Sequence, residues 1–250
     1  MYYVPDGTTK CGFYECKCCQ SRFLSLQTMK KMYERAYVFF QKYPLMISIG
    51  YMCIYFPIFS LLEQFCEPRY VIHCALDDMI PFNEWFVIPY VMWFAFVPGM
   101  VLFFLRKSKE DYIKCCKVIY GGMSICLLIY YLFPNGLSLR QPLEDKNICC
   151  MIVNQLRSAD TPANVCPSIH VSSTIGILFV LFNSEKLKKY RKLKAAMLVL
   201  GTLICISTVM IDQHSVVDAV CGMMLSAVLF YLVQLSEAPD QVTVFEEIKR

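Results

Sequence analysis

Long apolar runs recur six times in this chain of 250 residues, and they constrain its fold more than any other feature. They cover roughly residues 45–62, 83–105, 117–134, 168–183, 195–211 and 216–235. A bilayer core about 30 Å thick needs about 20 apolar residues in a helix, whose backbone groups pair internally. The runs therefore predict an all-α polytopic membrane protein, a bundle of six transmembrane helices. The fourth run is short, so we expect it to begin in a re-entrant segment or to pack against protein rather than lipid.

Composition supports a single membrane domain. Hydrophobic residues make up 57% of the chain and charged residues 18%, whereas a soluble domain carries about a quarter charged residues. We expect a cytoplasmic amino-terminal segment over 1–44, the membrane domain over 45–236 and a cytoplasmic tail over 237–250. The first residues lack the pattern of a cleaved signal peptide, so the first run is expected to serve as an uncleaved insertion signal.

The lysines and arginines fall on alternate connections between the runs. Four places hold 20 of the 24 basic residues: the segment before the first run, the second-to-third and fourth-to-fifth connections, and the tail. The others are Arg69, Arg140, Lys146 and Arg157. Because cytoplasmic loops carry an excess of Lys and Arg, both termini are predicted to be cytoplasmic and these four residues to face outward. The basic clusters adjoin apolar runs, so no nucleic-acid surface is expected.

The amino-terminal segment has two open interpretations. Residues 22–43 mix apolar and basic side chains, which fits an amphipathic helix on the inner leaflet or a cytoplasmic extension of the first span. Cys11, Cys16, Cys18 and Cys19 could bind zinc, but they match the usual zinc templates poorly, which favours a reduced cytoplasmic cluster. Many of the 15 cysteines lie inside apolar runs, where they are expected to act as small hydrophobes rather than as disulfides.

Two of the three histidines, His170 and His214, lie at the predicted outer ends of spans. An ionisable residue there is costly unless it is solvated or paired, so each is a candidate site residue. Asp218 follows His214 by four residues, which places both on one face of a helix. A carboxylate on one imidazole nitrogen leaves the other free as a nucleophile or base. The alternative is a helix-start pair without chemistry.

A helix start is also predicted at Pro167-Ser168-Ile169-His170. Free N–H groups and the helix dipole favour an anion there, the Ser168 hydroxyl adds a donor, and His170 can give or take a proton. Arg140 belongs to the same outer face, and its guanidinium suits a phosphate. The alternative for Ser168 and His170 is a serine cap beside an incidental histidine. The alternative for Arg140 is a charge solvated in a loop.

These residues resemble the motifs of the type 2 phosphatidic acid phosphatase superfamily of membrane lipid phosphatases. The resemblance rests on PSIH at 167–170, a variant found in Gram-positive bacteria, and on the spacing of Ser207, His214 and Asp218. It covers the chain from about Pro134 to the end of the sixth run. It implies a six-helix core with its site at the outer leaflet of a bacterial cell membrane.

The sequence departs from the family pattern at three places. The family has a lysine seven residues before an Arg-Pro pair, where this chain has Phe133, and Gln141 separates Arg140 from proline. The family also has arginine after the serine of its last motif, where this chain has Thr208, and glycine where Ile169 stands. Two expected cationic ligands of the phosphate are therefore missing, and Arg157 is a candidate to supply one.

The resemblance implies a role for each residue. His214 would attack phosphorus and Asp218 would orient it, while His170 would protonate the leaving oxygen. Phosphate-binding roles fall to four residues: Arg140, Ser168, Arg157 and Ser207. No cofactor or metal is expected, because no cluster of carboxylates or histidines is available on that face. Partners would be the lipid phosphate and membrane lipids. A lipid phosphotransferase using the same residues and a catalytically inactive scaffold of the same fold remain alternatives.

Overall fold

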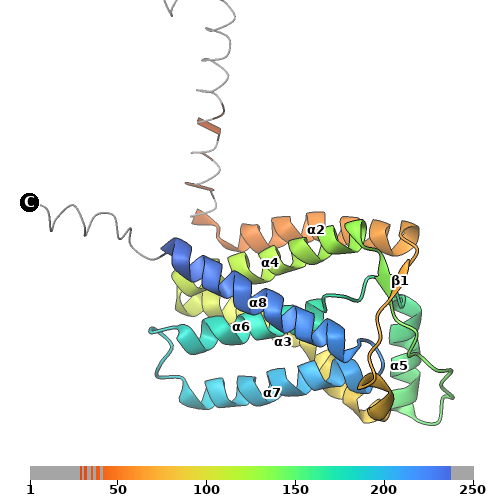
Figure 1. Cartoon of the computed structure of the whole chain (residues 1–250). Helices are drawn as coiled ribbons and strands as arrows, with labels where there is room; N and C mark the ends of the chain where they lie inside the picture. The colour runs from red at the N-terminus through yellow and green to blue at the C-terminus, as the bar shows by residue number, and fades with distance from the viewer. Residues whose placement is uncertain (1–28, 30, 33–34, 36–37, 40–41, 238–250) are drawn as a thin grey trace, which may run out of the picture. The chain divides into compact units, whose positions relative to one another are not determined.

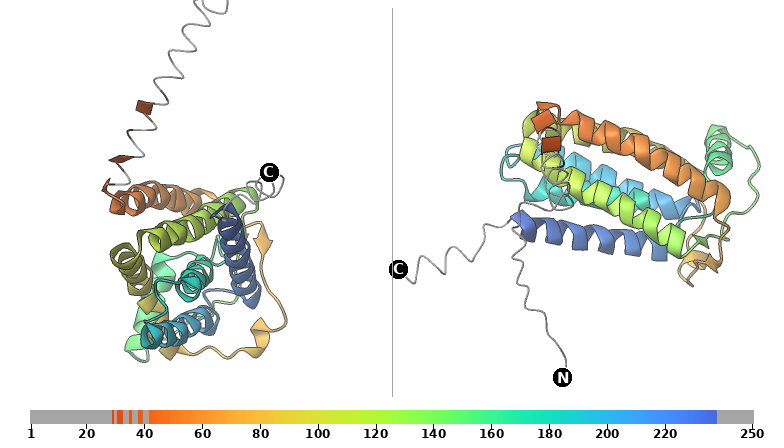
Figure 2. Two further views of the ribbon diagram at one scale, coloured as in Figure 1. Left: turned by 90° about the vertical axis from the view of Figure 1, so that its left-hand side faces the viewer. Right: turned by 90° about the horizontal axis from the view of Figure 1, so that it is seen from above.

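The computed structural model describes residues 29, 31–32, 35, 38–39 and 42–237. Residues from Ser48 onward form one compact unit, in which long helices run side by side (Figures 1 and 2). Its α-helices are α2 (Leu45–Phe65), α3 (Val87–Lys107), α4 (Lys109–Leu132), α5 (Ile148–Ala159), α6 (Ile169–Asn183), α7 (Arg191–Met210) and α8 (Val216–Glu237). Two short parallel strands, β1 (Tyr70–Val71) and β2 (Asn135–Gly136), pair Tyr70 with Asn135.

The predicted all-α membrane fold is confirmed. Five of the described helices are long and apolar enough to cross a bilayer: α2, α3 with the 3₁₀ turn before it, α4, α7 and α8. α6 is the sixth apolar helix and has 15 residues. At 1.5 Å per residue it spans only about 22 Å, less than the bilayer core. α4 begins at Lys109, eight residues before the predicted third run, so Lys114 and Lys117 lie within the helix rather than in the connection before it.

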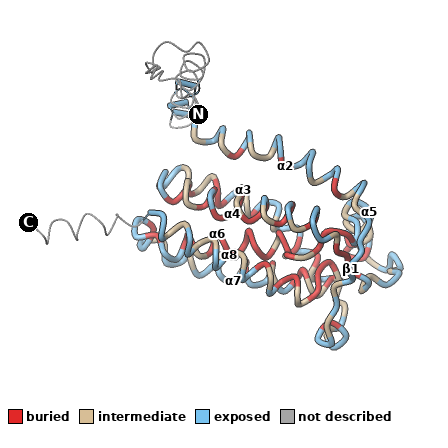
Figure 3. Tube along the Cα trace, turned by 45° about the horizontal axis from the view of Figure 1, so that its top comes forward, coloured by how far each residue is buried: buried red, intermediate tan, exposed pale blue. Residues whose placement is uncertain are grey.

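α6 is short because it runs through the middle of the bundle, as expected for a span that packs against protein. It contacts α4, α7 and α8, and ten of its 15 residues are buried. Figure 3 colours the trace by burial and shows that the buried residues concentrate inside the bundle. Small and hydroxylated residues allow this close packing. The Ser226 hydroxyl of α8 donates to the Ser172 carbonyl, and Trp93 Nε1 of α3 donates to Ser173 Oγ over 3.0 Å.

Two backbones approach closely where α8 crosses the start of α6. A Cβ added at Gly222 would lie 2.7 Å from the Ser168 carbonyl oxygen and 3.2 Å from the Ser172 nitrogen. We predict that Gly222→Ala pushes α8 away and costs about 1–3 kcal/mol, as overpacking of a core does. Thermal unfolding of the detergent-purified protein measures this loss. Gly99→Ala is the matched control, since nothing lies within 4 Å of its added Cβ; equal unfolding temperatures would contradict the prediction.

Ion pairs show which connections share one end of the bundle. Lys114 and Lys117 of α4 lie 3.1 Å and 3.0 Å from the Glu237 carboxylate at the end of α8. Lys186, in the connection between α6 and α7, lies 2.7 Å from Glu110 at the start of α4. The basic connections therefore gather at one end, and the starts of α6 and α8 lie at the other.

One helix, at the end of the bundle where α6 and α8 start, was not predicted. α5 lies within the long connection between α4 and α6 and runs crosswise to the bundle (Figure 1). Asn147 caps it by accepting the Cys150 N–H over 3.0 Å. Its Cys149 and Val153 are buried against Val87 of α3.

The proposed amino-terminal and carboxy-terminal segments lie largely outside the described residues, as do the four amino-terminal cysteines. The described residues between 29 and 42 are helical and exposed, and the helix is interrupted at Tyr43 and Pro44. An interfacial position for this helix stays a prediction. All cysteines that the structure describes are free thiols.

Candidate active site

His214 follows the turn that ends α7. The N–H of Gln213 donates to the Thr208 carbonyl over 3.0 Å, and the N–H of Asp212 to the Val209 carbonyl over 3.1 Å. This is the Schellman pattern, which requires a left-handed residue directly after the helix. Asp212 supplies it, with φ of 55°, a conformation that Asp and Asn tolerate better than most residues. The turn holds the backbone of His214, whose N–H also donates to the Thr208 carbonyl over 2.9 Å.

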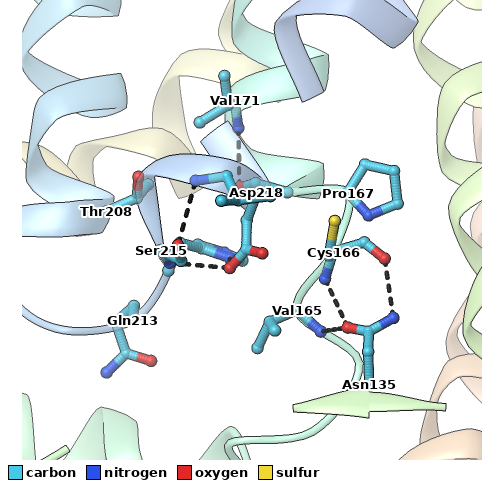
Figure 4. A network of polar contacts seen from close by, with 12 residues as sticks. Asn135, Val165, Cys166, Pro167, Val171, Thr208, Gln213, Ser215 and Asp218 are labelled. Atoms are coloured by element: carbon cyan, nitrogen blue, oxygen red, sulfur yellow. Dashed lines mark hydrogen bonds and ion pairs between the residues drawn. The ribbon is translucent and has the colours of Figure 1, made fainter. Parts of the chain in front are cut away.

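A capping box at the start of α8 positions Asp218 beside that histidine. Ser215 Oγ accepts the Val217 N–H over 3.1 Å, and Asp218 Oδ2 accepts the Ser215 N–H over 2.8 Å (Figure 4). The same Oδ2 lies 3.4 Å from His214 Nδ1. Asp218 is fully buried and His214 nearly so. The structure therefore brings His214 and Asp218 together, although at this distance His214 Nδ1 makes no hydrogen bond within the described part of the chain.

The start of α6 lies against the start of α8. Ser168 caps α6 by accepting the Val171 N–H over 3.3 Å, and its own N–H donates to the Asp218 carbonyl over 3.1 Å. Within the described chain, the N–H groups of Ile169 and His170 have no acceptor. These groups and the helix dipole can attract an anion, as expected at this position.

His170 is held between aromatic rings of α3. Its ring centroid lies 4.3 Å from that of Trp93, 4.7 Å from that of Tyr90 and 5.7 Å from that of His214. Its Nε2 is buried and has no hydrogen-bond partner among the described residues. The structure therefore brings both histidines together across the starts of two helices, with a free ring nitrogen on His170.

Arg140 reaches the same region from the connection between α4 and α5. Its Nη1 donates to the Asp160 carbonyl over 2.6 Å, and its Nη2 to Gln213 Oε1 over 2.6 Å. Burial lowers the pKa of the Arg140 guanidinium, and the Asp160 carboxylate, 4.0 Å away, opposes this shift. Two buried donors, Arg140 Nε and Gln213 Nε2, have no partner among the described residues. Buried donors without acceptors are costly, so this pair is suited to an anionic ligand.

Arg157 of α5 lies against the α7–α8 turn. Its Nη1 donates to the Gln141 carbonyl over 2.7 Å, and its Nη2 lies 3.4 Å from Asp212 Oδ2. The guanidinium also packs over the Phe82 ring at 5.3 Å. Burial lowers the pKa of Arg157, and Asp212 opposes this shift. Asp212 thus pairs with a cation, and Arg157 supports the turn that carries His214.

Ser207 is buried inside α7, where its hydroxyl donates to the Ile204 carbonyl over 2.6 Å. Thr208, which stands where the family has arginine, behaves alike and donates to the Cys205 carbonyl over 2.8 Å. The structure therefore shows both hydroxyls bonded to their own helix rather than to the histidines.

The loop before Ser168 is held by three residues that were not predicted from the sequence: Asn135, Tyr130 and Glu63. Asn135 Oδ1 accepts the N–H groups of Val165 and Cys166, and its Nδ2 donates to the Cys166 carbonyl over 3.0 Å (Figure 4). Tyr130 of α4 donates to the Pro167 carbonyl over 2.6 Å. In the same loop, the side-chain Nδ2 of Asn164 donates to Glu63 Oε1 of α2 over 2.9 Å. Such partners are distant in sequence, and no local pattern marks them.

The fold and the site define a polytopic α-helical membrane protein with paired histidines at one end of the bundle. The model of the PAP2 superfamily matches residues 142–238, a range that contains α5 to α8, and over this range the chain is similar to that superfamily. The superfamily generally comprises phosphatases that act on phosphoesters. Arg140 lies just before the matched range. The comparisons with curated proteins and with solved structures found no match.

Proposed function

We propose that the protein hydrolyses a lipid phosphate or diphosphate at the outer membrane face, through a phosphohistidine on His214. The observation that carries the proposal is the buried His214–Asp218 pair, 3.4 Å apart, with the His170 ring 5.7 Å away. The match of residues 142–238 to a phosphatase superfamily and a site built at the end of apolar helices support it.

The arrangement suits two chemical steps. With its Nδ1–H directed to Asp218, His214 presents an Nε2 lone pair that attacks phosphorus. The phosphorus–oxygen bond to the leaving group breaks as the P–N bond forms, and His170, in its protonated form, gives the leaving oxygen its proton. Water then attacks the phosphohistidine, gives a proton back to His170 and releases inorganic phosphate.

Charge in the transition state falls on the equatorial oxygens of the phosphoryl group. Arg140 Nε, Gln213 Nε2 and the N–H groups at the start of α6 are the donors available to them. Ser168 contributes its hydroxyl. Arg157 would act more remotely, through Asp212. Donors fixed before the reaction stabilise such charge most effectively, because they need no reorganisation.

Phosphate release by the purified protein tests this function. The substrates are phosphatidic acid and a polyisoprenyl diphosphate in detergent micelles, with a chelator present. We expect release without any added acceptor. Release that requires an acceptor lipid would indicate the phosphotransferase alternative, and no release from either lipid would favour the inactive scaffold.

The proposed orientation predicts which connections are accessible from outside. A cysteine at exposed Lys189, in the α6–α7 connection, should stay unlabelled by an impermeant thiol reagent on intact cells, because positive loops remain in the cytoplasm. A cysteine at exposed Lys146, in the α4–α5 connection, is the matched control and should be labelled. Both are made in a background without other cysteines. Labelling at position 189 would invert the proposed topology.

A further inference from the structure

A buried carboxylate from the connection between α2 and α3 binds the start of α8. Asp77 opens a short 3₁₀ turn, Asp77–Met79, and is only 6% exposed. Its Oδ2 accepts the Ser215 hydroxyl over 2.7 Å and the Cys74 N–H over 2.8 Å, and its Oδ1 accepts the Val216 N–H over 2.8 Å. Both carboxylate oxygens are thus engaged, with the two bonds to α8 bridging more than 130 residues of sequence.

The residues that Asp77 holds are those that arrange the candidate nucleophile. Ser215 is directly bonded to His214 in the chain, and its N–H donates to Asp218 Oδ2. That oxygen faces His214 Nδ1. A shift of Ser215 would therefore move the backbone on one side of the histidine and the carboxylate on the other. The hydrogen bonds of Asp77 in the described structure go to Ser215, Val216 and Cys74, not to His170 or His214.

The charge of Asp77 suits its position. The first N–H groups of α8 and the helix dipole favour a negative charge there. Burial acts to raise the pKa of Asp77, but the hydrogen bonds from Ser215, Val216 and Cys74 outweigh it and hold that pKa below its ordinary value. Asp77 is therefore a carboxylate at neutral pH, and it accepts charge-assisted hydrogen bonds that are stronger than neutral ones.

We propose that Asp77 is a positioning residue for the phosphohistidine step: it fixes Ser215 and Val216 so that Asp218 and His214 keep their mutual geometry. The inference rests on the proposed function. A misplacement of a reacting group by about 1 Å can cost about 100-fold in rate. A purely structural cap would affect how much protein folds, whereas a positioning residue changes the rate of each folded molecule.

Single-turnover measurements separate these two roles. Purified full-length protein is mixed with radiolabelled phosphatidic acid or polyisoprenyl diphosphate, and phosphoenzyme is trapped over time. We expect Asp77→Asn to form phosphoenzyme about 10–100-fold more slowly per active site, with KM within about twofold of native. The amplitude, which counts competent sites, should stay near native. Asp78→Asn is the matched control, because Asp78 is exposed, lies in the same turn and pairs only with His73.

Ser215→Ala provides a second variant should Asp77→Asn fail to fold. It removes one hydrogen bond to Asp77 and the bond that Ser215 Oγ accepts from the Val217 N–H, but it leaves the Val216 and Cys74 bonds to Asp77. We therefore expect a smaller decrease in rate, about 3–10-fold, at native amplitude. A native rate in either folded variant, or a loss of amplitude alone, would overturn the positioning role. If the native protein forms no phosphoenzyme and releases no phosphate from either lipid, the proposed function fails and this inference fails with it. A native rate in Asp77→Asn with an active native protein overturns this inference alone.

Discussion

Replacing His214 by alanine should abolish phosphate release, with a loss of about 10⁴-fold or more, as for other removed nucleophiles. The reason is that no other described side chain near Asp218 can take its place: His170 is held between the rings of Trp93 and Tyr90. Release of phosphate and trapping of phosphoenzyme measure the effect. Binding of the lipid should change little, because the phosphate donors remain.

His73→Ala is the control for that variant. His73 is the third histidine, it is exposed and pairs with Asp78, and its loop lies at the same end of the bundle. Its loss should leave phosphate release near native. His214→Ala protein that unfolds at the native temperature yet retains near-native activity on both lipids would show that the phosphohistidine mechanism is wrong.

The membrane fold was predictable because it depends on local chemistry. A helix pairs its backbone N–H and C=O groups internally, so each apolar run forms a helix in the bilayer whatever it packs against, and six runs give six helices. The start of α6 was also predictable, since Ser168 is a residue type that caps a helix. The approach of His214 to Asp218 was predicted from four-residue spacing on one helix face. The structure brings them together in another way, because His214 precedes α8 and Asp218 folds back to the Ser215 N–H.

The residues that shape the site could not be found this way. Asp77, Asn135 and Glu63 each bind backbone or side chains that are distant in the sequence, and their positions depend on how helices pack. α5 was missed because its apolar residues are too few for a span and its buried face is evident only against α3. Arg157 was expected near the phosphate for its charge alone. The structure shows that Asp212 and the Phe82 ring already engage it.

This chain lacks two cationic residues of the family pattern, a lysine and an arginine, so Arg140 is the principal positive charge at the site. Phe133 stands where the family has lysine, and its side chain is 58% exposed at the end of α4. Thr208 stands where the family has arginine and is bonded to its own helix. Only Arg140 and Arg157 therefore offer positive charge near His214 among the described residues, and Arg140 alone is bonded to the neighbouring Gln213.

Arg140→Ala should therefore lower kcat by about 10²–10³-fold, the usual loss when a fixed donor to a developing oxyanion is removed. It also leaves Gln213 Oε1 and two carbonyls of the 160–161 segment without their donor, so a lower unfolding temperature is expected. Activity per folded molecule, measured below that temperature, separates the two effects. Arg69→Ala is the matched control, since Arg69 is exposed on a connection at the same end.

Two further arginine variants sharpen the assignment. Arg140→Lys should recover only part of the activity, because an ammonium keeps the charge but lacks the planar fork whose separate nitrogens bond the Asp160 carbonyl and Gln213. Arg157→Ala should have a smaller effect than Arg140→Ala, because Arg157 acts through Asp212 and the turn. If the Arg140→Ala, Arg157→Ala double variant hydrolyses lipid phosphate at the native rate, the phosphate must bind elsewhere, and the donors around Gln213 are not its ligands.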